Sequence, residues 1–165
     1  MDLAEWNRLP AADAQRELLA CCASPRWAAT VARGRPYTGA GAVLAAGQTA
    51  LDGLDWADVR AALDAHPRIG ERIAATKGRE ADWSRREQSG AQDADATTAA
   101  ELVKANEAYE ERFGHVFLIF ATGKSAGEML AAARERLAND EATERAVVLR
   151  ELAKITRLRM ERLLT

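Results

Sequence analysis

The scarcity of proline limits what this chain can fold into more than any other feature of its sequence. Only four prolines occur among 165 residues, whereas alanine is the most frequent residue. Alanine has the highest helix propensity and proline the lowest, so this balance favours helices. Clusters of β-branched residues are rare, and no Asn-Gly or Asp-Gly pair separates two alternating apolar runs, so no β-hairpin is indicated. We therefore predict an all-α protein, with residues 1–165 forming a single compact domain of about eight or nine helices.

Capping signals predict where several helices begin. Ser24-Pro25 provides an N-cap residue followed by proline at the first helical position, and Asp55 can cap the helix that follows it. The segments Thr98–Glu101 and Ser125–Glu128 both match the capping-box pattern. The helices predicted in this way cover residues 13–22, 25–34, 38–53, 55–66, 83–90, 98–112 and 125–138, and a long last helix follows Asp140.

The pattern leaves the secondary structure of two segments open. Residues 66–78, with the sequence HPRIGERIAATKG, show no regular period and are expected to be irregular. Residues 116–121, with the sequence VFLIFA, form a short apolar run that suits either a buried strand or a buried helix. Any strand is therefore expected only at residues 116–121.

Charge and hydropathy exclude several classes of function. The chain has 23 basic and 25 acidic residues, a formal net charge of -2, so no basic surface for nucleic acid is expected. No apolar run approaches the roughly 18 residues that a membrane span needs, and the N-terminus lacks the pattern of a signal peptide. We therefore expect a cytoplasmic protein that binds neither nucleic acid nor membrane.

Few residues are available for metal or redox chemistry. Cys21 and Cys22 are adjacent and poorly placed to bridge each other, which favours a reducing compartment over a disulfide scaffold. With so few cysteines and histidines, a zinc site is not expected. The segment Gly123-Lys124-Ser125 resembles the end of a phosphate-binding loop, but that motif requires a glycine where Leu118 stands. The sequence therefore predicts neither a metal site nor a phosphate-binding loop.

The last helix carries a charge where an apolar residue is expected. At about 100° per residue, Arg159 falls inside the apolar arc, between Ile155 and Leu163, whereas Glu151 falls outside it. A guanidinium is costly to bury unless an anion meets it. Arg159 can therefore form a buried ion pair, extend its head to water, or receive an anionic ligand through its planar fork.

The two histidines occupy different sequence contexts. His66 lies at the predicted end of a helix and directly precedes Pro67. It can be a hydrogen-bonded structural residue, or a rigidly mounted general acid or base, since imidazole titrates near neutral pH. His115 stands beside the apolar run without an obvious companion, so we place it second to His66 as a candidate.

Glu87 also admits two interpretations. It precedes Gln88 in a short amphipathic segment, directly after Arg85 and Arg86. It can be a solvated partner of those arginines, which would contribute little, or a carboxylate with a role in a site.

Five short motifs follow one another along the chain. They are His66-Pro67-Arg68-Ile69-Gly70, Ser84-x-x-Glu87-Gln88, Asn106-x-x-Tyr109-x-x-Arg112-Phe113-Gly114-His115-Val116-Phe117, Gly123-Lys124-Ser125 and Ile155-x-x-Leu158-Arg159. In that order and at those spacings they resemble the family of 2-oxo-4-hydroxy-4-carboxy-5-ureidoimidazoline (OHCU) decarboxylases. The resemblance covers almost the whole chain and is weakest before residue 60. Three positions depart from the family: His115 often has an apolar counterpart, Thr122 often has a basic one, and Ser89 usually has an alanine.

The resemblance implies an all-helical homodimer that requires no metal or organic cofactor. The family's reaction is the carboxy-lyase step of urate breakdown in purine metabolism, which converts OHCU to (S)-allantoin and carbon dioxide. The resemblance assigns the catalytic histidine, glutamate and arginine to His66, Glu87 and Arg159. The substrate-binding residues that it implies are Pro67, Ser84, Gln88, Phe117, Leu118, Ile119, Phe120 and Ala121.

Two other functions remain compatible with these residues. The chain can be a non-catalytic helical binding module, in which Arg159 and Glu87 form a buried ion pair and His66 is structural. It can also be a lyase that acts on another small ureido or imidazole acid. The proton that His66 would transfer and the role of Glu87 stay open.

Overall fold

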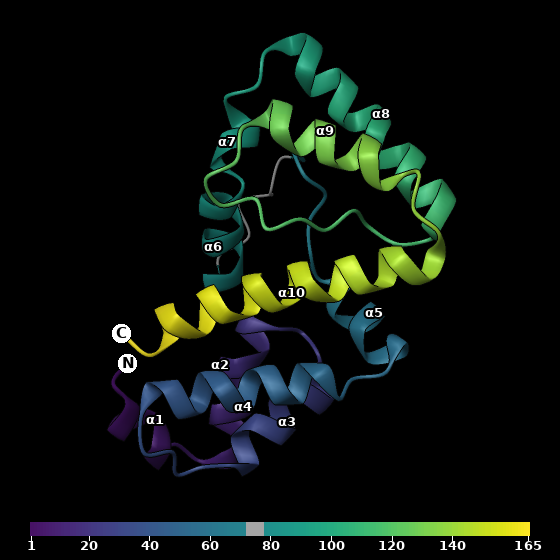
Figure 1. Ribbon diagram of the computed structural model, residues 1–165. Coiled ribbons are helices and arrows are strands. Elements are labelled where there is room, and N and C mark those ends of the chain that lie inside the picture. Colours follow the sequence, from purple (N-terminus) through teal and green to yellow (C-terminus); the bar gives the residue numbers. More distant parts are fainter. Residues whose placement is uncertain (72–77) are drawn as a thin grey trace. The chain divides into compact units, whose positions relative to one another are not determined.

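The computed structural model describes residues 1–71 and 78–165, and all of its regular structure is helical (Figure 1). Within these residues there are ten helices and no strand. They are α1 (Leu3–Arg8), α2 (Ala11–Cys21), α3 (Pro25–Arg33), α4 (Ala40–Asp52), α5 (Trp56–Asp64), α6 (Arg79–Glu87), α7 (Ser89–Gln92), α8 (Ala96–Phe113), α9 (Ala126–Arg136) and α10 (Glu141–Leu163). The prediction of an all-α protein is confirmed. The count exceeds eight or nine because α1 and α7 span only 6 and 4 residues, too few to show a helical period.

Three of the predicted helix starts are confirmed by their caps. In each, a side-chain oxygen accepts a hydrogen bond from the backbone N–H three residues later, which satisfies one of the free donors of the first turn. The capping residues and their distances are Ser24 at 3.3 Å, Asp55 at 2.9 Å and Ser125 at 3.1 Å.

The predicted start of α8 at Thr98 is wrong. Asp95 is the N-cap, and its carboxylate accepts a hydrogen bond of 2.7 Å from the Thr98 N–H, so the helix begins at Ala96. Aspartate caps a helix at least as well as threonine, and the earlier start adds helical residues. Glu101, the other half of the expected box, pairs with Arg134 of α9 instead.

The two segments whose secondary structure was open are both irregular where they are described. Residues 66–71 contain turns and no helix, and the expectation for residues 72–77 lies outside the described residues. Residues 116–121 form neither a helix nor a strand, although Phe117, Leu118, Ile119 and Ala121 are buried.

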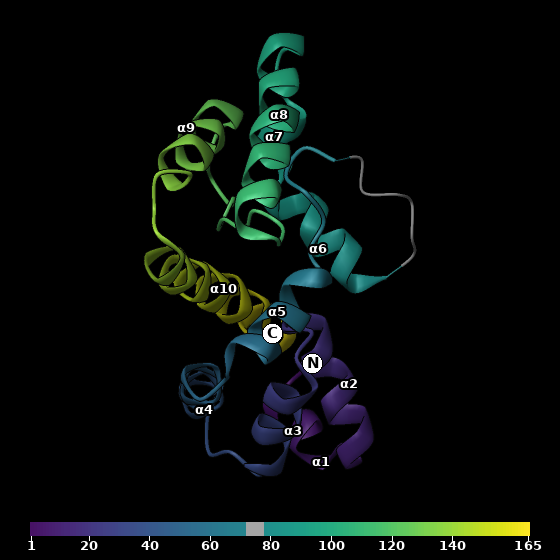
Figure 2. The same cartoon turned by 90° about the vertical axis from the view of Figure 1, so that its right-hand side faces the viewer.

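The chain divides into two compact units: residues 1–62 with 153–165, and residues 63–152. In the first unit α2 and α3 lie side by side (Figure 2). Its buried side chains include Trp6, Leu18, Trp27, Leu51 and Met160. The indole N–H of Trp27 donates to the carbonyl of Gly47 in α4 at 2.9 Å, which satisfies a polar group that its burial would otherwise leave unpaired. The prediction that residues 1–165 make one domain stays a prediction.

In the second unit α8 and α9 lie side by side (Figures 1 and 2). Their facing side chains form an apolar cluster with Phe117, Ile119 and Ala121 of the irregular segment. The members contributed by the two helices include Leu102, Ala105, Tyr109, Met129, Leu130 and Ala133. The irregular segment is therefore part of the core of this unit.

Gly90 in α7 lies against the loop that leads into α9. A Cβ atom at this position would lie 2.0 Å from the backbone carbonyl oxygen of Lys124. Only glycine allows so close an approach of two backbones. This contact joins α7 to the loop between the irregular segment and α9.

No helix within the described residues combines the length and the apolar character that crossing a membrane requires.

Replacing Gly90 tests this close approach. Gly90→Ala should lower the free energy of unfolding by about 1–3 kcal/mol, because the added methyl forces α7 and the Lys124 loop apart. Urea unfolding followed by circular dichroism measures the change. The matched control is Gly127→Ala in α9, where the nearest neighbour of the added Cβ is the Ser125 Oγ at 3.9 Å. That variant should be unchanged or up to about 1 kcal/mol more stable, since alanine is the better helix former. Equal stability of Gly90→Ala and the unmodified protein would contradict the inferred contact.

Candidate active site

His66 lies just beyond α5, in a loop whose backbone is held at three points. Its own N–H donates to the Leu63 carbonyl at 2.9 Å. The side-chain amide of Asn106 in α8 donates to the Ile69 carbonyl at 2.8 Å, and the N–H of Gly70 donates to the Gln88 side-chain oxygen at 3.3 Å. Gly70 has a φ of 81°, a left-handed conformation that other residues rarely adopt. The half-buried His66 therefore extends from a firmly positioned loop.

Arg68 adds a fourth attachment for this loop. Its guanidinium makes two parallel hydrogen bonds, of 2.7 and 2.9 Å, to the carboxylate of Glu110 in α8. This bidentate arrangement fixes both distance and orientation. The pair is largely exposed, so it serves geometry more than stability.

The end of α6 presents three buried polar side chains on one face. Ser84, Glu87 and Gln88 are three and four residues apart, which places them together on a helix surface, and they are 6%, 6% and 7% exposed. The interpretation of Glu87 as a solvated partner of Arg85 and Arg86 is therefore wrong. Gln88 also accepts the hydrogen bond from Gly70, so this face lies beside the loop that carries His66.

An open pocket of about 440 Å³ brings the two histidines together. His66 and His115 both line it, with Arg68, Glu71, Glu110 and neighbouring residues of α5 and the Gly114 turn. Within the described part of the chain, the lining of this pocket contains none of the predicted site residues Pro67, Ser84, Glu87 and Gln88. It also contains none of residues 117–121.

The charges around this pocket favour no carboxylate ligand. Among the described residues of the lining, Asp64, Glu71 and Glu110 contribute three carboxylates and Arg68 contributes one guanidinium. That guanidinium already holds Glu110 with both of its hydrogen bonds. A carboxylate ligand would therefore need a cation from outside this lining.

His115 is a buried residue of the pocket wall, at 7% exposed. Its Nδ1 lies 3.1 Å from the carbonyl oxygen of Val116, and because a carbonyl oxygen can only accept, Nδ1 is the donor. The ring packs edge-on against Tyr109, with 5.5 Å between centroids. His115 is thus held both by a hydrogen bond and by an aromatic neighbour.

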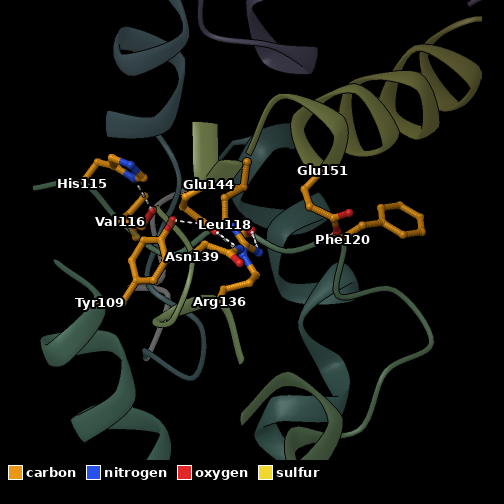
Figure 3. A network of polar contacts seen from close by, with 9 residues as sticks. All are labelled: Tyr109, His115, Val116, Leu118, Phe120, Arg136, Asn139, Glu144 and Glu151. Carbon is orange, nitrogen blue, oxygen red and sulfur yellow. Dashed lines mark hydrogen bonds and ion pairs between the residues drawn. The ribbon is translucent and has the colours of Figure 1, made fainter. Parts of the chain in front are cut away.

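A buried polar network lies behind the irregular segment (Figure 3). Glu144 of α10 is fully buried and accepts from the Tyr109 hydroxyl, from the Arg136 guanidinium at 2.8 Å and from the Asn139 amide at 3.0 Å. Arg136 in turn donates to the Leu118 carbonyl at 2.6 Å. Burial raises the pKa of Tyr109 far above its ordinary value, and its hydrogen bond to Glu144 adds to the rise, so Tyr109 is a neutral donor.

A second carboxylate of α10 holds the same segment. Glu151 accepts a hydrogen bond of 2.8 Å from the Phe120 N–H. The helical projection placed Glu151 outside the apolar arc, yet it is only 9% exposed. That expectation is wrong because the irregular segment covers α10 on this side, a contact that no single-helix projection contains.

Arg159 belongs to the first unit. It is 5% exposed, so its predicted place on the buried face of α10 is confirmed. Cys22 is close enough for the guanidinium to act on its thiol. Burial raises the pKa of Cys22 from 9.0 to about 11, against the opposing effects of Ser24, Thr156 and Arg159. Cys22 is therefore a neutral thiol beside Arg159 and no nucleophile.

Among residues 1–71 and 78–165, no group of three or more His, Cys, Asp or Glu side chains is arranged to hold a metal ion.

Sequence reasoning missed the residues that hold the loops of the second unit. Asn106, Tyr109 and Arg112 stand three residues apart in one of the recognised motifs, but their partners lie on other elements. Asn106 binds the Ile69 carbonyl, Tyr109 binds Glu144, and Arg112 donates to the Asn139 carbonyl at 2.7 Å. Their spacing along one helix was visible in the sequence, whereas the identity of their partners was not.

Comparison with known proteins agrees with the resemblance in the sequence. The family model described as OHCU decarboxylase matches residues 7–161. The chain is 34% identical over 147 residues to the uric acid degradation bifunctional protein TTL of Arabidopsis thaliana, a match that covers 87% of this chain and 45% of that protein. It is also 34% identical over 139 residues to the 2-oxo-4-hydroxy-4-carboxy-5-ureidoimidazoline decarboxylase of Amia calva, covering 83% of this chain and 79% of the relative. The chain thus spans just under half the length of the Arabidopsis protein.

Solved structures share the fold. A crystal structure of an OHCU decarboxylase in the presence of (S)-allantoin superposes with a TM-score of 0.78 at 28% sequence identity, covering 90% of this chain and 96% of that one. A crystal structure of an (S)-allantoin synthase has a TM-score of 0.76 at 15% identity, covering all of this chain and 54% of its own, and it shows likeness of fold alone.

Removing the amide that holds the His66 loop should destabilise the protein. In Asn106→Ala the buried Ile69 carbonyl loses its donor, so the free energy of unfolding should fall by about 1–3 kcal/mol. Urea unfolding measures it. Glu107→Ala, at the exposed neighbouring position of α8, is the control and should change stability by less than about 0.5 kcal/mol. Identical curves for both variants would contradict a structural role for this amide.

Because the thiol of Cys22 is buried, we predict that the free energy of unfolding falls in alkali. Because its pKa is raised to about 11 on folding, the native state retains a proton that the unfolded chain releases near pH 9. This contribution to stability is therefore fully present below pH 9 and is lost as the pH rises toward 11. Between these limits, the free energy of unfolding should fall more steeply with pH in the unmodified protein than in Cys22→Ala. Parallel slopes from urea unfolding at successive pH values would show that the thiol is not perturbed.

Proposed function

The chain belongs to the OHCU decarboxylase family, and on that premise we propose that it converts OHCU to (S)-allantoin and carbon dioxide in the breakdown of urate. The observation that carries this proposal is the family match over residues 7–161. The relative from Amia calva, which bears the name of this decarboxylase, supports it with 34% identity over 83% of the chain.

The chemistry of the substrate explains how so few catalytic groups can suffice. In OHCU the carboxylate is attached to a carbon next to a C=N bond. When the carbon–carbon bond to the carboxylate breaks, its electron pair passes into the C=N system, a role that a cofactor would otherwise fill. The neighbouring hydroxyl loses its proton to become a carbonyl, while one carbon and the ring nitrogen of the former C=N bond each gain a proton, so that one proton is taken up overall. The protein has to hold the carboxylate and move these protons.

We assign the proton transfer to His66. Imidazole titrates near neutral pH, so it can take the hydroxyl proton or deliver one to carbon. Three backbone hydrogen bonds and the Arg68–Glu110 pair hold the loop that carries it, which supports a role that demands accurate placement. Delivery of the proton to a single face of the planar intermediate would yield one enantiomer of allantoin.

We assign binding of an anionic or carbonyl group of the substrate to Arg159. A planar guanidinium suits a carboxylate through two parallel hydrogen bonds. Its 5% exposure supports this role, since a charge-assisted hydrogen bond is stronger in surroundings that exclude water.

The buried face at the end of α6 supplies the remaining polar contacts of the proposal. Glu87 would set the charge and orientation of His66 or bind the ureido nitrogens of the substrate. Ser84 and Gln88 would offer neutral hydrogen bonds to an amide-rich ligand. Pro67 and residues 117–121 would complete the binding surface, as the family resemblance implies.

Three further proposals concern the protein as a whole, of which the homodimer and the absence of a cofactor rest on the resemblance. We propose that it is a homodimer, that it is cytoplasmic, and that residues 1–165 act as one domain that needs no metal or organic cofactor.

Substitution of His66 tests the assignment of the proton transfer. His66→Gln should reduce the formation of (S)-allantoin by about 100-fold or more, because a general acid or base typically contributes 10²–10⁴-fold. The substrate is generated in place from urate with a uricase and a hydroxyisourate hydrolase, and circular dichroism follows the chiral product. The companion variant is His115→Phe, which introduces the kind of residue that the family often has there and should keep its activity within about threefold. Full activity of His66→Gln would refute the role of His66.

The same assay separates the competing functions. If the unmodified protein does not accelerate (S)-allantoin formation, the chain is a binding module or acts on another acid. Decarboxylation of a different ureido or imidazole acid would establish the second of these.

A further inference from the structure

The side chains of the irregular segment 116–121 alternate between two environments, with a period of two residues. The side chains of Phe117, Ile119 and Ala121 belong to the apolar cluster between α8 and α9, whereas those of Leu118 and Phe120 do not. Alternation of this kind is typical of an extended backbone. The segment is therefore extended although no neighbouring strand pairs with it among the described residues.

The backbone contacts of the segment follow the same period. Side chains bind the Val116 carbonyl, the Leu118 carbonyl and the Phe120 N–H, at 3.1, 2.6 and 2.8 Å. In an extended chain the N–H and C=O of alternate residues point to the same edge. His115, Arg136 and Glu151 thus take the place of a neighbouring strand along one edge of the segment.

The two helical contacts on this edge differ in how they are supported. Arg136 is locked by the fully buried Glu144 (Figure 3). Its guanidinium carbon also lies 4.6 Å from the centroid of the Phe117 ring. It fixes the middle of the segment. Glu151 reaches from seven residues further along α10 to the Phe120 N–H, the last of the three points before the chain turns at Gly123.

We propose that Glu151 is a positioning residue of the reaction. Its carboxylate holds the Phe120 N–H and so keeps the opposite edge of segment 117–121 aligned. That edge carries the amide and carbonyl groups of Phe117 and Ile119, which bind the ureido and ring amide groups of the substrate. This inference rests on the proposed function, because it takes residues 117–121 as part of the substrate-binding surface. Glu151 itself touches no substrate in this account and acts through the backbone.

Two conservative substitutions separate the reach of the side chain from its charge. Glu151→Asp keeps the charge but is one methylene shorter, so its carboxylate no longer reaches the Phe120 N–H at 2.8 Å. Glu151→Gln keeps the length and offers an amide oxygen as the acceptor but removes the charge. The matched control is Glu141→Asp, the same change at an exposed position of the same helix.

The first readout is hydrogen exchange of the Phe120 amide, followed by nuclear magnetic resonance in the protein without substrate. Exchange should be at least about tenfold faster in Glu151→Asp and nearly unchanged in Glu151→Gln and Glu141→Asp, because only the first loses the acceptor. The second readout is steady-state kinetics with OHCU. The KM of Glu151→Asp should rise by about tenfold with kcat within threefold, whereas Glu151→Gln should keep both within about threefold.

Each outcome decides a separate question. If Glu151→Asp keeps its KM, or if Glu151→Gln is the impaired variant, the side chain does not act through its reach and the proposal is overturned. A loss of activity that only parallels a fall in melting temperature in both variants would show a purely structural role and overturn it equally. If the unmodified protein does not decarboxylate OHCU, the proposed function fails; binding of (S)-allantoin measured by calorimetry then replaces the KM, and its weakening in Glu151→Asp alone would still support the positioning role.

Discussion

Partly buried backbone without secondary structure is the constraint on which the second unit depends. Residues 66–70 and 116–121 carry the candidate site, and neither segment has a helix or a strand to pair its N–H and C=O groups. An unpaired backbone group in the interior costs about as much as a lost hydrogen bond, so other groups must satisfy each one. Asn106 and Gln88 do so for the first segment, and Arg136 and Glu151 for the second. The buried charges of Arg136 and Glu151 thus meet a requirement of the second segment.

This constraint separates the residues that hold the site from those proposed to act in it. Asn106 and Tyr109 occur in one of the recognised motifs together with His115, yet each binds the protein itself. Glu144 accepts hydrogen bonds from Tyr109, Arg136 and Asn139, and it is not part of the lining of the pocket that contains His66. A motif in this chain therefore records the support of the loops as much as the chemistry.

The sequence predicted the helices well where a local signal marks them. Ser24, Asp55 and Ser125 cap their helices as expected, because a capping bond joins residues only three positions apart. The predicted cap at Thr98 is wrong, because Asp95, three residues earlier, provides it. The short helices α1 and α7 were missed because fewer than two turns show no period. The site residues followed from the family resemblance, and the structure adds that Ser84, Glu87, Gln88 and Arg159 are buried.

The sequence by itself determined the fold class, the positions of most helices and the family, because helix propensity, caps and motif spacing are all local properties of the chain. It also identified Arg159 as a buried charge from the period of a single helix. Only the tertiary structure decided that 116–121 is extended, that Glu87 and Glu151 are buried, and that His66 and His115 line one pocket. Each of these depends on contacts between residues far apart in the chain, such as the 31 positions that separate Phe120 from Glu151. A local pattern cannot specify such a partner, because burial is a property of the two surfaces that meet and not of either one alone.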